Sequence, residues 1–142
     1  MSTNDLVHLY FDRSNALQGY WTLYVVIIGG LLAFSSMRQR PSFWTTIIVA
    51  VLYCCFAYKN LGAIHDTTDQ RIAILSSIRA APPGDAALQQ LLPTLGVPDY
   101  PGVRNFHVFC DVLTVIALFS FEVRRRRFRR EDLAAAPAVG RD

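Results

Sequence analysis

Apolar residues are gathered in three long runs that polar segments separate. Residues 14–37 contain no Asp, Glu, Lys or Arg over 24 positions, and residues 41–58 contain none over 18 positions. A third run, residues 105–123, contains only Asp111 and Glu122 as charged side chains. A helix crosses the roughly 30 Å hydrocarbon core of a bilayer with about 20 apolar residues. Each run therefore has close to the length of one membrane crossing.

The pattern within the runs predicts membrane helices rather than the helices of a soluble bundle. A helix at the surface of a soluble protein carries a polar face. The stretches WTLYVVIIGGLLAF (21–34) and SFWTTIIVAVLYCCFAY (42–58) show no such face. We expect an all-α integral membrane protein with three transmembrane helices, at residues 17–37, 42–59 and 106–123.

Five segments follow from this pattern. Residues 1–16 are predicted to form an N-terminal interfacial segment, and residues 17–59 a transmembrane helical hairpin. An extracytoplasmic helical segment follows at residues 60–105, a third transmembrane helix at 106–123 and a basic cytoplasmic tail at 124–142. Ser14 or Asn15 is the expected cap at the start of the first span. Between the second and third spans, a helix is predicted to begin near Thr67, and a short helix is predicted at residues 85–92.

Basic residues predict the orientation of the spans, because Lys and Arg gather in short cytoplasmic loops. With the N-terminus outside, the turn around Arg38 and the C-terminal tail are cytoplasmic and contain nine of the 14 Lys and Arg residues. We therefore predict a multi-pass protein of the plasma (inner) membrane, with its N-terminus outside and its C-terminus inside. Aromatic residues favour the headgroup level, so Tyr20, Trp21 and Tyr24 are expected at the outer end of the first span.

Composition agrees with a membrane protein and gives no sign of an enzyme. Charged residues make up 18% of the chain, against about 25% in a typical soluble domain. The chain contains no phosphate-binding glycine loop, no HExxH and no CxxC. All three cysteines fall within predicted spans, where we expect packing rather than disulfides. We predict neither enzymatic activity nor a bound cofactor or metal.

Asp111 is the strongest candidate for a functional residue within the spans, because a buried ionisable side chain in a membrane is costly. His107 lies one helical turn away on the same face. One interpretation is an ion or proton contact near a pore mouth, with His107 and Thr114 as further candidates. The other is a structural polar contact to another helix. Besides an arginine of the outer segment, its candidate partners are Thr45, Thr46 and Tyr53.

Small residues indicate where helices approach each other closely. Gly29 and Ala33 form a small-xxx-small pair in the first span, with Gly30 beside them. Such pairs allow helix backbones to touch. Because three spans leave much surface for neighbours, we expect a homo-oligomer.

The arginine run RRRRFRR follows the third span directly, so its first residues are expected at the level of the lipid headgroups. We predict that the run sets the topology and binds anionic lipid. Its basic residues are Arg124, Arg125, Arg126, Arg127, Arg129 and Arg130. Glu122 is expected to pair with Arg126. Several copies around one axis would also attract an anionic or nucleotide ligand, whereas sequence-specific nucleic-acid binding is not expected.

The stretch SNALQGYWTLYVVIIGGLLAF, residues 14–34, resembles the first span of small multi-span bacterial membrane proteins. Some proteins of this group are pore-forming effectors of phage-defence operons. The resemblance covers 21 of the 142 residues and includes no catalytic or ligand motif. It implies an oligomer that forms a pore.

Two functions are compatible with these features. The first is a homo-oligomeric ion channel or pore-forming membrane effector, gated by an anionic or nucleotide ligand at the basic tail. The alternative is a non-conducting membrane subunit or anchor of a larger complex, with residues 60–105 as its interaction surface. A proton-coupled transporter is less favoured, because three spans and one buried acid offer little for alternating access.

Overall fold

The computed structural model is all-helical and describes residues 3–40, 42–80, 90, 92–96 and 98–135. Its elements are three long helices and a short 3-10 helix: α1 (Thr3–Met37), α2 (Phe43–Ala80), η1 (Leu92–Thr94) and α4 (Tyr100–Ala135). Each long helix contains a segment that is apolar and long enough to cross a membrane. One predicted span falls on each of them, as expected for a multi-pass membrane protein.

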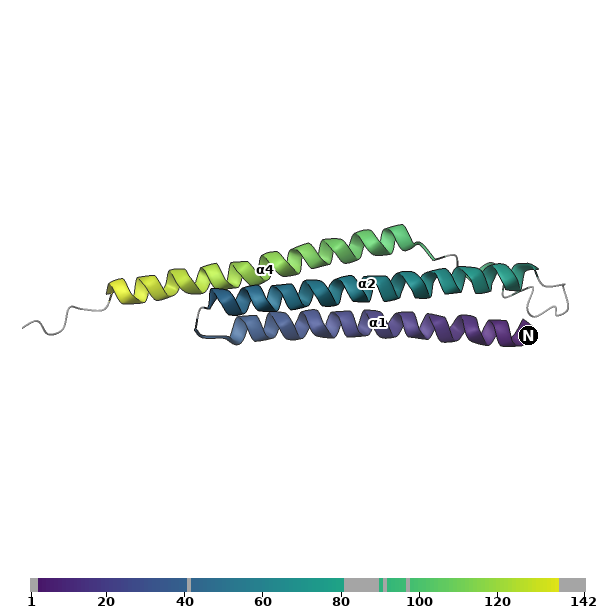
Figure 1. Ribbon diagram of the computed structural model, residues 1–142, viewed down its shortest axis with the longest axis horizontal. Coiled ribbons are helices and arrows are strands. Elements are labelled where there is room, and N and C mark those ends of the chain that lie inside the picture. Colours follow the sequence, from purple (N-terminus) through teal and green to yellow (C-terminus); the bar gives the residue numbers. More distant parts are fainter. Residues whose placement is uncertain (1–2, 41, 81–89, 91, 97, 136–142) are drawn as a thin grey trace, which may run out of the picture.

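The three long helices lie side by side along most of their length (Figure 1). α1 and α2 form an antiparallel hairpin, and we call the end that contains their connection the turn end. α4 contacts both helices, and α2 more extensively. It is displaced along the bundle, so that its last turns extend beyond the turn end (Figure 1). At the opposite end, the head end, α1 and α2 extend past the start of α4.

Polar side chains cap the starts of α2 and α4. The Oγ of Ser42, which precedes α2, accepts a hydrogen bond from the backbone N–H of Thr45 at 3.4 Å. The Oδ1 of Asp99, which precedes α4, accepts one from the backbone N–H of Gly102 at 3.1 Å. Such a cap satisfies an amide that has no partner within the first helical turn. The two caps therefore set where the second and third span-bearing helices begin.

Two predicted helix starts are wrong, because both positions lie inside continuous helices. Ser14 and Asn15 fall within α1, where the Ser14 hydroxyl donates to the carbonyl of Tyr10 instead of capping a helix. Thr67 falls within α2, and its side chain is buried. Neither α1 nor α2 contains a proline, so the backbone hydrogen bonding continues where the apolar runs end. The two spans thus extend directly into the head end.

The other segments outside the apolar runs are described in part. Most of the short helix predicted at residues 85–92 lies outside the described residues; Gln90 is helical, and Leu92 begins η1. The arginine run is helical throughout, because α4 continues to Ala135. The basic segment is therefore a stiff extension of the third span as far as that residue.

The buried face of α2 has the heptad spacing of a coiled coil. Its buried residues along the span are Thr46, Ala50, Tyr53, Ala57 and Asn60, separated alternately by four and three positions. This spacing keeps one side of a helix against its partners. Polar side chains occupy much of this face, whereas large apolar side chains of the same helix are exposed. The bundle therefore has polar groups inside and apolar groups on its surface.

The head end contains an apolar core of its own. Its buried members are Tyr10, Ile74, Leu75, Ile78 and Leu95. The hydroxyl of Tyr10 donates to the carbonyl of Gly96 at 3.2 Å, and Arg71 Nη2 donates to the same hydroxyl at 2.9 Å. These contacts hold the segment after η1 against the hairpin.

Candidate functional site

Two clusters of polar side chains lie inside the bundle at different levels. The first, called the aspartate cluster, consists of Tyr24, Tyr53, Asn60, His107 and Asp111. The second, called the glutamate cluster, lies at the turn end and consists of Arg38, Ser42, Thr46, Glu122, Arg125 and Arg126. The residues of the aspartate cluster come from all three long helices. Those of the glutamate cluster come from α2, from α4 and from the connection between α1 and α2.

Asp111 is the centre of the aspartate cluster. Its Oδ1 accepts hydrogen bonds from the hydroxyls of Tyr24 at 2.8 Å and Tyr53 at 2.7 Å. Its Oδ2 lies 2.9 Å from Nδ1 of His107. One carboxylate thus connects α1, α2 and α4, while 22% of its side chain remains exposed. The arrangement ties the third helix to the hairpin at the level of the spans.

The imidazole of His107 is held on several sides and is 0% exposed. Its Nε2 lies 3.3 Å from the amide nitrogen of Asn60. With this nitrogen as donor, Nε2 accepts and Nδ1 is left to donate to Asp111. The ring of Tyr24 lies over the imidazole, with 4.0 Å between the ring centroids. These contacts fix the orientation in which His107 meets the carboxylate.

The three predicted pore contacts therefore all point into the bundle of a single chain. Thr114 is buried with them, and its hydroxyl donates to the carbonyl of Cys110 at 2.8 Å. Of the partners considered for Asp111, Tyr53 is the one that it contacts. Within one chain the geometry is that of a structural contact between helices, and contact with a permeating ion stays a prediction.

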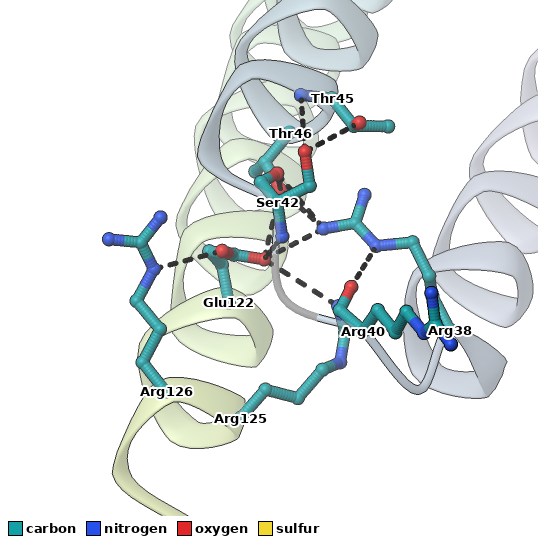
Figure 2. A network of polar contacts seen from close by, with 8 residues as sticks. All are labelled: Arg38, Arg40, Ser42, Thr45, Thr46, Glu122, Arg125 and Arg126. Carbon is teal, nitrogen blue, oxygen red and sulfur yellow. Dashed lines mark hydrogen bonds and ion pairs between the residues drawn. The ribbon is translucent and has the colours of Figure 1, made fainter. Parts of the chain in front are cut away.

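Glu122 is the centre of the glutamate cluster and is 2% exposed (Figure 2). Its Oε2 lies 2.7 Å from Nη2 of Arg38 and accepts from the Thr46 hydroxyl at 3.3 Å. Its Oε1 accepts from Nε of Arg126 at 2.9 Å, which confirms the predicted pair. Arg125 Nη1 lies 3.7 Å from Oε2. One carboxylate thus meets three guanidinium groups.

Arg38 completes the hairpin connection as well as the ion pair. Its Nε donates to the carbonyl of Arg40 at 3.2 Å, and its Nη2 donates to the carbonyl of Ser42 at 3.1 Å. The backbone N–H of Ser42 in turn donates to Glu122 at 3.4 Å. The connection between α1 and α2 is therefore bonded to α4 through one guanidinium and one carboxylate.

The arginines of the run differ in their contacts with Glu122. Arg125 and Arg126 contact Glu122, and the side chain of Arg126 is still 47% exposed; lipid or anion binding by these two residues stays a prediction. The remaining arginines have exposed side chains, and within the described part of the chain they form no ion pair. They are Arg124, Arg127, Arg129 and Arg130. The guanidinium of Arg124 lies over the ring of Phe128, 5.5 Å from its centroid.

The small residues of the first span do not mediate packing between the helices described here. Gly29, Gly30 and Ala33 are exposed. Among the described residues, none lies within 4 Å of a Cβ placed on either glycine. Their predicted role in close helix approach stays a prediction about contacts with another molecule.

Sequence reasoning misplaced Tyr24 and missed the roles of Asn60 and Arg38. Tyr24 was expected among the interfacial aromatics, but it is 2% exposed and belongs to the aspartate cluster. The signal that identifies such positions is the heptad spacing, because Tyr53 and Asn60 are seven residues apart on the buried face of α2. Asn60 could therefore have been predicted from its spacing to Tyr53, whereas this spacing gives no signal for Tyr24 or Arg38.

The cysteines and acids suggest no further site. Cys54, Cys55 and Cys110 are free. Among the described residues, no three His, Cys, Asp or Glu side chains are close enough to hold a metal ion.

Comparisons with known protein families, curated proteins and solved structures find no match. The function must therefore be argued from the two clusters and the surfaces around them.

Proposed function

We propose that this chain is a non-conducting membrane subunit, which anchors partner proteins through a rigid bundle of three helices. The observation that supports this most strongly is that the polar side chains of the spans bind one another within a single chain. The aspartate cluster engages Asp111 and His107, the residues that were the main candidates for contact with an ion. In this proposal the aspartate and glutamate clusters hold the three helices of the bundle together.

The contacts of Asp111 show why the internally bonded form is favoured. If Asp111 turned toward a pore between chains, it would lose Tyr24, Tyr53 and His107. A hydrogen bond between membrane helices contributes about 0.6 kcal/mol on average. A buried donor left without a partner costs about 1–3 kcal/mol. The Tyr53 hydroxyl and the imidazole would lose Asp111 as an acceptor, whereas the Tyr24 hydroxyl also lies 3.2 Å from the carbonyl of His107. The cost of the rearrangement would fall on every subunit.

The proposed orientation places the head end outside and the turn end at the cytoplasmic face of the plasma (inner) membrane. Arg38, Arg40 and the arginine run of α4 gather at the turn end, as the preference of basic residues for the cytoplasmic side requires. The head end, which includes the described part of residues 60–105, would then be the surface that meets a partner. The extension of α4 offers exposed arginines to an acidic surface or to lipid.

Ion flux from liposomes tests this proposal. Purified full-length protein is expected to release trapped ions no faster than empty liposomes, at a density where a known channel conducts. Asp111→Asn should leave the flux unchanged. Flux above that of empty liposomes, altered by Asp111→Asn, would refute the proposal. In native membranes the protein should migrate with a second polypeptide, and migration as a homo-oligomer alone would also count against it.

A homo-oligomeric channel is the second candidate, and it includes the pore-forming role in phage defence. It is favoured by the exposed Gly29, Gly30 and Ala33, which would allow a second copy to approach α1 closely. The exposed arginines of α4 would then gather around the axis and attract anions. Arg124→Glu with Arg127→Glu should alter conductance or gating while assembly persists. Unchanged currents in planar bilayers would argue against this candidate.

A further inference from the structure

We propose that α4 carries a binding site for an anionic phospholipid, on a surface beside the glutamate cluster. The site is a groove with a volume of about 530 Å³. It is lined by Val115, Ile116, Phe119, Ser120, Val123, Arg124 and Arg127, all on α4. The lipid phosphate binds Arg124 and Arg127, and an acyl chain lies along the apolar residues. The groove is shallow and open along one side of the helix, as a surface that is covered by a lipid chain would be.

Apolar and basic residues follow one another along the groove as tail and headgroup do in a phospholipid. The apolar part runs from Val115 to Val123, which is about 12 Å along a helix. Half of the hydrocarbon core measures about 15 Å. The neighbouring Glu122 is bonded to the backbone of Ser42 at the hairpin connection. Arg124 and Arg127 therefore lie at the level where the chain leaves the spans, which is where headgroups are found.

The two arginines have donors available for a phosphate. Both are exposed, and neither forms an ion pair within the described residues. Arg125 and Arg126, by contrast, are directed to Glu122. A guanidinium group presents a planar fork of N–H donors that matches two phosphate oxygens. Arg125 and Arg126 thus bind Glu122, whereas Arg124 and Arg127, at one end of the groove, can bind an anion.

Charge and shape together favour a lipid over other occupants. A soluble anion would use the arginines and leave the apolar part of the groove uncovered. A second copy of the chain in the same orientation would bring its own arginines to the same level, where the charges repel. An anionic phospholipid covers the apolar part and places a negative phosphate beside the two guanidinium groups.

Native mass spectrometry of the full-length protein, titrated with phosphatidylglycerol in neutral detergent, tests the proposal. Arg124→Gln with Arg127→Gln should weaken lipid binding by at least roughly tenfold. Arg129→Gln with Arg130→Gln removes the same charge from the same helix outside the groove and is expected to weaken lipid binding less than the first pair does. Ser120→Trp, which fills the groove at an exposed position, should also lower occupancy. Far-ultraviolet circular dichroism confirms that each variant keeps its helical content.

Three outcomes would overturn this assignment. An equal loss in the two paired variants would mean that diffuse positive charge attracts the lipid. Displacement of the lipid by excess inorganic phosphate would mean that the arginines bind the anion without the groove. Loss of a dimer in the Arg124 and Arg127 variant, with unchanged lipid occupancy, would assign the groove to a second copy of the chain.

Discussion

Asp111 and Glu122 are two carboxylates on the same face of α4, and they are held by different kinds of donor. Asp111 meets two tyrosine hydroxyls and one imidazole, whereas Glu122 meets the guanidinium groups of Arg38 and Arg126 most closely. Asp111 lies eleven residues, or about 16 Å, farther from the turn end. Asp111 is thus stabilised without an arginine, whereas Glu122, the more buried of the two, is stabilised by cations that are themselves partly exposed. Substitutions at the two sites should therefore differ in magnitude and in salt dependence.

The largest expected effect is that of Glu122→Ala, which removes the carboxylate shared by the arginines. Loss of one partner from a buried ion pair costs about 3–5 kcal/mol, because the other charge stays buried without compensation. Unfolding in mixed micelles with increasing denaturing detergent measures the change. Glu131→Ala, at an exposed position of the same helix, is the matched control. Similar losses in the two variants would contradict the described role of Glu122.

Asp111→Asn is expected to have a smaller effect, of about 1–3 kcal/mol. The remaining amide oxygen can still accept from the tyrosines, but one carboxylate oxygen is replaced by a donor beside His107 or the hydroxyls. The same unfolding measurement applies, with the exposed Asp66→Asn as control. A loss as large as that of Glu122→Ala would remove the distinction drawn between the two sites.

Tyr24→Phe and Tyr53→Phe should each destabilise the protein by about 0.5–1.5 kcal/mol. Both hydroxyls donate to the same oxygen of Asp111, so their effects should not be additive. A double-mutant cycle of unfolding free energies measures the coupling. Tyr58→Phe, at a side chain that is 76% exposed, is the control. Strict additivity would indicate that the two hydroxyls do not share an acceptor.

Arg126→Ala should have the smallest effect, below about 1 kcal/mol. Its side chain is 47% exposed, against 17% for Arg38, so water already screens much of its attraction to Glu122. Unfolding at low and high salt is the relevant measurement, because the contribution of an exposed pair falls as salt rises. Arg38→Ala should be more damaging and less sensitive to salt. The reverse order would show that the exposed arginine carries the interaction.

The number and approximate positions of the spans could be predicted from the sequence, because the length of an apolar run determines whether it can cross a membrane. The continuation of α1 through Ser14 and of α2 through Thr67 could not. Local capping patterns were read there as helix starts, but neither helix contains a proline that would interrupt it. The i,i+4 pair of Glu122 and Arg126 was predictable, since both residues lie on one helix. Arg38 was not, because its partner is 84 residues away.

The interior of the bundle was hidden for a different reason. In a protein surrounded by water, buried faces are apolar and amphipathic patterns identify them. In a membrane the surface is also apolar, so hydropathy alone does not distinguish the inside from the outside. Tyr24 therefore resembled an interfacial aromatic, although the bonding of its hydroxyl to Asp111 places it at the centre.

The ion pair between Arg38 and Glu122 also has a consequence for biosynthesis. The ribosome completes α1 and α2 before it reaches α4, so the nascent hairpin contains Arg38 before Glu122 has been synthesised. The pair can close only when the last helix has been inserted in the correct direction. Its formation thus depends on the helix that is made last. A chain truncated before Glu122 would leave Arg38 without this carboxylate, and we expect such a product to be recognised and degraded by membrane quality control.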